Sequence, residues 1–296
     1  QTRKTGLSRI LRRKWCFHTL RGSIFDEKKL VLVDEQIAAL TSSGKKDYSS
    51  EYEMEELLTR RFDLMKKLSL PKEELDAFLN RYTSYSDIRK LCVQQALDEG
   101  KTDEAIRLLD EGKSADRDKR GLVAEYSKWL MDLYERQGQR DKQLAELEYH
   151  VFVLSSGGME MLNRLKKACT PAQWIEYRER YLSGRSYHKL DLMESEELWE
   201  RLMKAVATAG HLSILDRYEA ALKKRYPNEM LEAYACILTK EAAASDRKRY
   251  QELARYLKKL RNYPGGAERV ARPAEDWRTR YIRRRAMMEE LRNAGF

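Results

Sequence analysis

Cysteine and histidine are the residues of this chain best suited to bind a metal or to act as a nucleophile. The sequence holds four of each: His18, His150, His188, His211, Cys16, Cys92, Cys169 and Cys236. We identify no second metal ligand beside any histidine at the i+3 or i+4 spacing by which one helix presents two ligands. None of these residues lies in a recognisable nucleophile motif. The spacing therefore predicts packed or surface side chains, and no catalytic, cofactor-binding or metal-binding residue.

One short motif, Cys16-Phe17-His18, has the C-x-H form that makes up half of a zinc site. A complete site needs two more ligands, and no other cysteine lies within 70 residues. The wide spacing of the cysteines also excludes a dense disulfide framework. We therefore expect free thiols and a cytoplasmic protein. The alternative is that two of the four cysteines, distant in sequence, meet in space.

A cluster of arginines near the end of the chain could contact phosphates. It comprises Arg278, Arg280, Arg283, Arg284 and Arg285, with Trp277 and Tyr281 interleaved. Cations that follow a nucleic-acid backbone, with aromatic rings for stacking, are a known means of binding single strands. The alternative is an amphipathic helix, in which Trp277, Tyr281, Met288 and Leu291 form one apolar stripe and the arginines face solvent. The sequence favours this second interpretation.

Two other features offer weaker chemistry. Consecutive glycine amides, as at Gly265-Gly266, can cradle an anion, but no Gly-Lys-Ser/Thr and no preceding strand completes a phosphate loop here. We expect a turn between Leu260 and Val270. Neighbouring carboxylates such as Glu73-Glu74 stand in helix-like stretches, where they are typical of solvated faces. No pair stands out as an acid and base couple, so we expect a chain that is not an enzyme.

The composition favours long, charged helices. The chain has 296 residues, of which 36% are charged and 42% hydrophobic, with 14 Gly and 5 Pro. No apolar run approaches the roughly 18 to 20 residues of a membrane span, and the basic opening segment lacks the features of a signal peptide. Residue 1 is Gln rather than Met. We therefore expect a non-membrane protein that is a piece of a longer one.

The net charge of +10 is concentrated at the two ends. Residues 1–29 contain nine Lys/Arg and two Asp/Glu, and residues 245–296 contain fifteen and seven. The remaining body is therefore mildly acidic, and negatively charged partners would meet the ends.

Apolar residues at helical spacing, interrupted by short glycine-centred turns, recur from Tyr82 onward. The clearest turns are centred on Gly100, Gly138 and Gly210. Glycine tolerates the left-handed conformation that ends a helix, and Thr102 or Asp103 could cap the helix that follows Gly100. Helical hairpins recurring near this length predict an all-α fold, a right-handed α-solenoid that resembles tetratricopeptide repeats in architecture.

Two further breaks and one ambiguous run complete the pattern. Thr170 and Pro171 should begin one helix, as cap and first helical residue, and Pro227 should begin another. Residues 30–33 (LVLV) are too short to distinguish a strand from a buried helix turn. The polar residues 41–50 suggest a mobile linker. We predict a basic, irregular or partly helical segment at 1–47, helical hairpins at 48–244, and basic helices at 245–296 packed on them.

Several stretches resemble the C-terminal helical region of bacterial SWIM zinc-finger proteins. They are residues 146–152 (ELEYHVF), 215–219 (LDRYE), 225–227 (RYP), 245–250 (SDRKRY), 256–266 (YLKKLRNYPGG) and 284–296 (RRAMMEELRNAGF). The similarity covers roughly residues 85–296. In that family an N-terminal finger, C-x-C followed by C-x-H, binds zinc and is presumed to contact DNA or protein. Such proteins are associated with SWI2/SNF2-type ATPases.

This chain has no C-x-C, so no zinc ligand carries over to it. The resemblance implies that the finger and its zinc lie upstream of Gln1. Solenoids commonly hold a partner protein. Our first hypothesis is therefore a non-catalytic scaffold that binds a protein, with a SWI2/SNF2-type ATPase as the partner the resemblance implies. The second is a nucleic-acid-binding accessory domain that uses its basic termini.

Overall fold

The chain is helical throughout the part that the structure describes. The structure is a computed structural model that describes residues 23–44, 47–243 and 246–296. These residues form sixteen α-helices and one short π-helical segment, with no strand among them, which confirms the predicted all-α class. Within the same residues no helix has both the length and the apolar character needed to cross a membrane. The chain divides into two compact units, residues 1–174 and 175–296.

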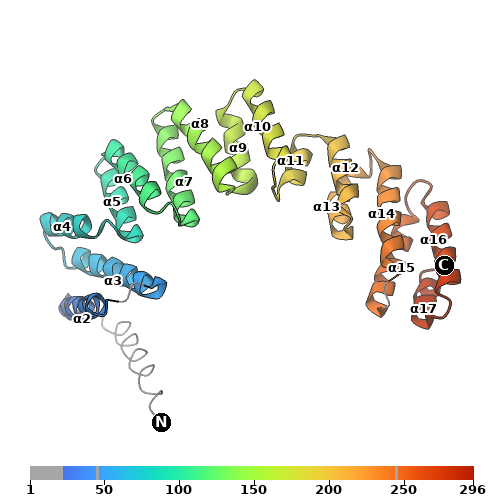
Figure 1. The fold of residues 1–296 in the computed structure, drawn as a ribbon, viewed down its shortest axis with the longest axis horizontal. Helices are drawn as coiled ribbons and strands as arrows, with labels where there is room; N and C mark the ends of the chain where they lie inside the picture. The colour runs from blue at the N-terminus through green and yellow to red at the C-terminus, as the bar shows by residue number, and fades with distance from the viewer. Residues whose placement is uncertain (1–22, 45–46, 244–245) are drawn as a thin grey trace, which may run out of the picture. The chain divides into compact units, whose positions relative to one another are not determined.

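The helices of the first unit pack against one another in chain order (Figure 1). They are α2 (Ser23–Ser42), α3 (Tyr48–Lys67), α4 (Lys72–Tyr82), α5 (Ser86–Asp98), α6 (Thr102–Ala115), α7 (Arg120–Arg136), α8 (Arg140–Tyr149), the π-helical η1 (His150–Leu154), α9 (Gly158–Ala168) and the start of α10 (Pro171–Ser183).

The run at residues 30–33 belongs to α2, which settles the choice between strand and helix. Val33 and Ile37 are buried against the core that α2 shares with α3, α4 and α5, whereas Val31 is 59% exposed. A spacing of four between buried residues is the period of an amphipathic helix. In the polar stretch 41–50, residues 41–42 end α2 and residues 48–50 begin α3, while the described residues between them, 43, 44 and 47, lie outside both helices.

The three predicted glycine turns are confirmed. Gly100, Gly138 and Gly210 have φ of +73°, +68° and +70°, and each separates two consecutive helices. The left-handed conformation at a helix end reverses the chain, and glycine adopts it without a steric penalty. Each turn therefore lets the two flanking helices pack as a hairpin.

Two of the three predicted helix starts are confirmed. Pro227 begins α14, and Thr170 precedes Pro171 at the start of α10, where its Oγ1 accepts a hydrogen bond from Gln173 N at 3.3 Å. The Gln173 side chain reaches back to Thr170 N at 2.9 Å, so the two residues cap the helix reciprocally. The prediction for α6 is wrong. Thr102 is its first helical residue, and Lys101 occupies the cap position with no side-chain hydrogen bond.

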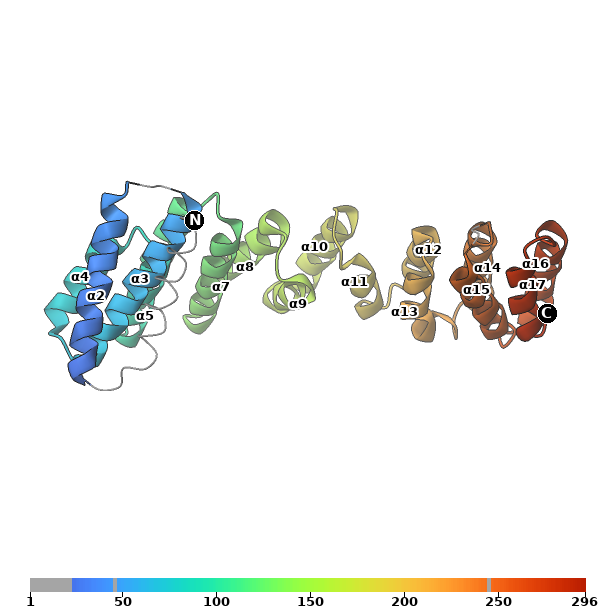
Figure 2. The same cartoon turned by 90° about the horizontal axis from the view of Figure 1, so that it is seen from below.

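The second unit contains the rest of α10 and the C-terminal helices, which also pack on their neighbours (Figure 2). These are α11 (Lys189–Ser195), α12 (Trp199–Ala209), α13 (Leu212–Leu222), α14 (Pro227–Glu241), α15 (Arg247–Leu260), α16 (Gly266–Arg280) and α17 (Arg285–Asn293). The predicted boundaries near residues 47 and 244 fall beside residues outside the described ranges, and they stay predictions.

The predicted single apolar stripe from Trp277 to Leu291 is wrong. The chain breaks between α16 and α17, and Met287 is buried in place of Met288. Arg284 explains the break, because its guanidinium donates hydrogen bonds to the carbonyls of Ala242 at 3.2 Å and Ala243 at 3.1 Å. These tertiary contacts fix the conformation of residues 281–284, which connect α16 to α17.

Candidate functional site

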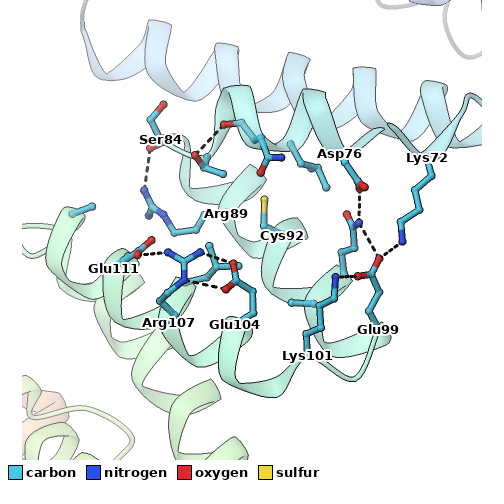
Figure 3. Close-up of a pocket in the computed structure, with 17 residues that line it drawn as sticks. Lys72, Asp76, Ser84, Arg89, Cys92, Glu99, Lys101, Glu104, Arg107 and Glu111 are labelled. Carbon is cyan, nitrogen blue, oxygen red and sulfur yellow. Dashed lines mark hydrogen bonds and ion pairs between the residues drawn. The ribbon is translucent and has the colours of Figure 1, made fainter. Parts of the chain in front are cut away.

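A groove of about 660 Å³ lies between α4, α5 and α6 in the first unit (Figure 3). Each helix supplies a row of side chains spaced three or four residues apart, the spacing at which residues share one helix face. The rows are Lys72, Asp76 and Asn80 on α4, Arg89, Cys92 and Gln95 on α5, and Glu104, Arg107 and Glu111 on α6. The groove is thus built by three helix faces that turn toward one another.

The floor of the groove is apolar. It is formed by Leu79, Ala96 and Leu108, all buried, and by Cys92, whose sulfur occupies the middle of the groove in Figure 3. Burial raises the pKa of the Cys92 thiol to about 11. The thiol is therefore neutral at physiological pH and lines the floor as a small apolar group.

One rim carries a cluster of four charges around Glu99. Lys72 Nζ and Lys101 Nζ each lie 2.6 Å from a Glu99 carboxylate oxygen, and Gln95 Nε2 donates to Asp76 Oδ1 at 2.6 Å. Hydrogen bonds from Lys101, Lys72 and Gln95 lower the pKa of Glu99 to about 2. With two cations and two carboxylates, this rim has no net charge.

The other rim is negative. Arg107 is paired with Glu104 and Glu111 on the same helix, and its Nε donates to Glu104 Oε2 at 3.0 Å. Two carboxylates and one guanidinium give this rim a net charge of −1. All three side chains are about half exposed, so the pairs add little stability and their atoms stay accessible to a ligand.

A buried ion pair fixes the wall beside the groove. Arg89 and Asp116 are 6% and 7% exposed and form a salt bridge. Tyr126 OH donates to Asp116 Oδ2 at 3.0 Å, and Arg89 Nη2 donates to the Ser84 carbonyl at 3.2 Å. The pKa of Tyr126 is raised, chiefly by burial and then by the Asp116 charge. The network joins α5, the end of α6 and α7, and so sets the position of two of the three groove helices.

The other candidate histidines that the structure describes do not line this groove. Cys16 and His18 lie outside the described residues. His150 is buried beside Ser127, with Nδ1 3.2 Å from Oγ, and burial lowers the pKa of its imidazole. His188 Nδ1 lies 3.1 Å from Asp191 Oδ2, a carboxylate at the i+3 position that sequence reasoning passed over. Over the described ranges no three His, Cys, Asp or Glu side chains come together as a metal site.

The five candidate arginines have different environments. Arg278 and Arg280 lie in the last turn of α16, 3.6 Å and 3.7 Å from Glu275 and Asp276 of the same helix. Arg283 and Arg285 are exposed. Arg284 makes the carbonyl contacts described above, and its guanidinium carbon lies 4.2 Å from the centre of the Tyr281 ring. Arg284 therefore has a clear structural role, and phosphate contact by the set stays a prediction.

The turn predicted at Gly265-Gly266 is confirmed. Gly265 caps α16 with φ of +67°, and Gly266 is the first helical residue. A Cβ at position 266 would lie 2.0 Å from the Leu260 carbonyl oxygen. Close packing of the turn against the end of α15 accounts for this glycine without any bound phosphate.

Sequence reasoning did not find the groove. Its residues come from three helices, and each row taken alone has the charged pattern of a solvated face. The only local indication of a groove was Cys92, which interrupts the polar face of α5 with a neutral side chain between Arg89 and Gln95. No protein-family model, no curated protein and no solved structure matches this chain.

Proposed function

We propose that this chain is a non-catalytic helical-repeat scaffold that binds a partner protein, and that the groove between α4, α5 and α6 receives an extended segment of that partner. The observation that carries the proposal is the combination of an apolar floor and charged rims in one open groove. Protein-binding sites join an apolar pocket for an anchoring side chain to polar groups that fix its orientation.

The lining indicates what the partner segment looks like. A short aliphatic side chain would contact the floor chiefly at Cys92, which is only partly buried. A lysine or arginine beside it would meet the surplus negative charge of Glu104 and Glu111. Asn80 is exposed on the lip of the groove, and its side chain has no intramolecular hydrogen bond among the described residues, so it can bond the partner's backbone.

The proposal extends to architecture and to family. Successive hairpins with glycine turns, each packed on the next within its unit, support a right-handed, TPR-like α-solenoid. The resemblance to SWIM zinc-finger proteins supports a larger protein in which this chain is the helical portion and zinc is held by an upstream finger. A SWI2/SNF2-type ATPase is the partner that this resemblance suggests. The scattered cysteines support the cytoplasm as the location.

The groove can be tested by selecting random peptides on the full chain and measuring their affinity for two double variants. Glu104→Gln with Glu111→Gln removes both acids around Arg107. We expect the enriched peptides to carry a basic residue next to an aliphatic one. We expect this variant to bind them at least about tenfold more weakly than the wild type, the equivalent of 1.4 kcal/mol.

A matched control is available in the same unit. Arg164 is also flanked by two acids, at 2.8 Å from Asp132 and 2.9 Å from Glu135, and neither acid lines the groove. Asp132→Asn with Glu135→Gln makes the same change of charge and should leave the affinity within about twofold. Equal losses in both variants, or no loss in either, would rule out the groove as the binding site.

A further inference from the structure

The basic excess of the C-terminal region is concentrated on α15. This helix contains six Lys/Arg and a single acid, Glu252. Its buried face is formed by Tyr250, Leu253, Ala254, Tyr256, Leu257 and Leu260. Lys248, Arg255 and Lys258 lie on the opposite face and are exposed. We call these three residues the α15 strip.

The charges of the strip are uncompensated, whereas those around it are neutralised. Arg247 pairs with Glu289 of α17 at 3.1 Å, and Arg249 pairs with Glu241 and Glu252, both at 3.0 Å. The strip cations form no ion pair with any described residue. Arg255 only packs its guanidinium carbon 5.0 Å from the centre of the Tyr256 ring. The strip therefore presents three positive charges to solvent.

A hydrogen-bonded network holds α15 in place beneath the strip. Asp216 of α13 accepts hydrogen bonds from Tyr234 OH of α14 at 2.7 Å and from Lys259 Nζ of α15 at 2.6 Å. Tyr256 OH donates to the same carboxylate, and Lys259 Nζ also lies 2.5 Å from Glu219 Oε2. Because these contacts join three helices, the strip lies on a fixed support rather than on an isolated helix.

We propose that the α15 strip binds the phosphate backbone of double-stranded nucleic acid. Seven residues of helix separate Lys248 from Arg255 by about 10.5 Å, and three separate Arg255 from Lys258 by about 4.5 Å. Long cationic side chains at such intervals can reach successive phosphates along one strand. This site goes beyond the proposed protein-binding groove and uses residues of the other unit.

The composition of the strip favours a duplex over two other partners. Single-strand binding uses exposed aromatic rings for stacking, but Tyr250 and Tyr256 of α15 are buried. A protein interface needs an apolar anchor near its centre, and no exposed large apolar side chain accompanies the strip on α15. Binding to a phosphate backbone needs only the cations.

The test measures binding of the full chain to a labelled random-sequence duplex by fluorescence anisotropy over a range of salt concentrations. The strip variant carries Lys248→Gln, Arg255→Gln and Lys258→Gln. The control carries Arg278→Gln, Arg280→Gln and Arg285→Gln, which removes the same charge from the arginines that the sequence singled out. We expect the strip variant to lose at least about tenfold in affinity and about 2.7 from the slope of log affinity against log salt.

The control should stay within about threefold of the wild type. Absence of salt-dependent duplex binding by the wild type would overturn the proposal. An equal loss of duplex affinity in both variants would also overturn it. A larger loss in the control would overturn it too, and would indicate that Arg278, Arg280 and Arg285 contact the phosphates. Tighter binding to single strands than to the duplex, or equal binding to polyglutamate, would overturn the choice of partner. Circular dichroism checks that both variants remain helical.

Discussion

Replacing Asp116 with alanine is expected to destabilise residues 1–174 by about 3 to 5 kcal/mol, because it leaves the buried Arg89 charge without its counterion. Arg89 is 6% exposed, and its guanidinium also donates to Tyr126 OH at 3.1 Å and to the Ser84 carbonyl at 3.2 Å, contacts that hold the charge in place when Asp116 is removed. The Tyr126 hydroxyl would also lose its acceptor. Since the chain has two units, hydrogen exchange read by mass spectrometry is the appropriate measurement, with peptides from residues 86–136 expected to lose protection.

Asp118→Ala provides the control for this experiment. Asp118 is 94% exposed and lies 3.9 Å from Arg117, an arrangement worth little in water. Its exchange pattern should match that of the wild type. The double variant Arg89→Met with Asp116→Leu removes both charges and should recover most of the lost protection. An Asp116→Ala protein as protected as the wild type would show that the network does not hold the groove helices.

Replacing Gly266 with alanine is expected to destabilise the packing of α16 on α15 by about 2 to 3 kcal/mol through overpacking. The added Cβ would lie 2.0 Å from the backbone oxygen of Leu260, which belongs to a helix and cannot rotate away. Hydrogen exchange of peptides covering residues 247–280 reports the effect. Weakened protection should extend across the turn into both helices.

The neighbouring glycine makes a matched control. A Cβ at Gly265 would meet no atom within 4 Å, so Gly265→Ala adds only the cost of a left-handed alanine at φ of +67°, about 1 to 2 kcal/mol. Gly266→Ala should therefore be the more damaging change. The opposite order would mean that conformation at this turn matters more than close packing.

Local features of the structure could be predicted from the sequence. The turns at Gly100, Gly138 and Gly210 and the cap at Thr170 depend on conformational preferences that a few neighbouring residues determine. The α-helical class followed from apolar periodicity for the same reason. The run at residues 30–33 could not be assigned, because four apolar residues fit either a strand or a helix until the packing of Val33 is known.

The features that were missed depend on contacts between distant residues. No glycine or proline marks the break at residues 281–284, which is held by Arg284 against the end of α14. The groove requires three helix faces to converge. The α15 strip emerges only once the pairing of Arg247, Arg249 and Lys259 with acids of other helices is known, because the sequence alone shows one uniformly basic segment.

The most direct test of the protein-binding groove is site-specific photocrosslinking in the cells that make this protein. A photoreactive amino acid in place of Asn80 samples the lip of the groove. The same amino acid in place of Val153, which is 56% exposed on η1 and does not line the groove, samples another surface of the same unit. We predict a discrete crosslinked protein from position 80 that is absent from position 153. No adduct at position 80, or the same adducts from both positions, would contradict a binding role for the groove.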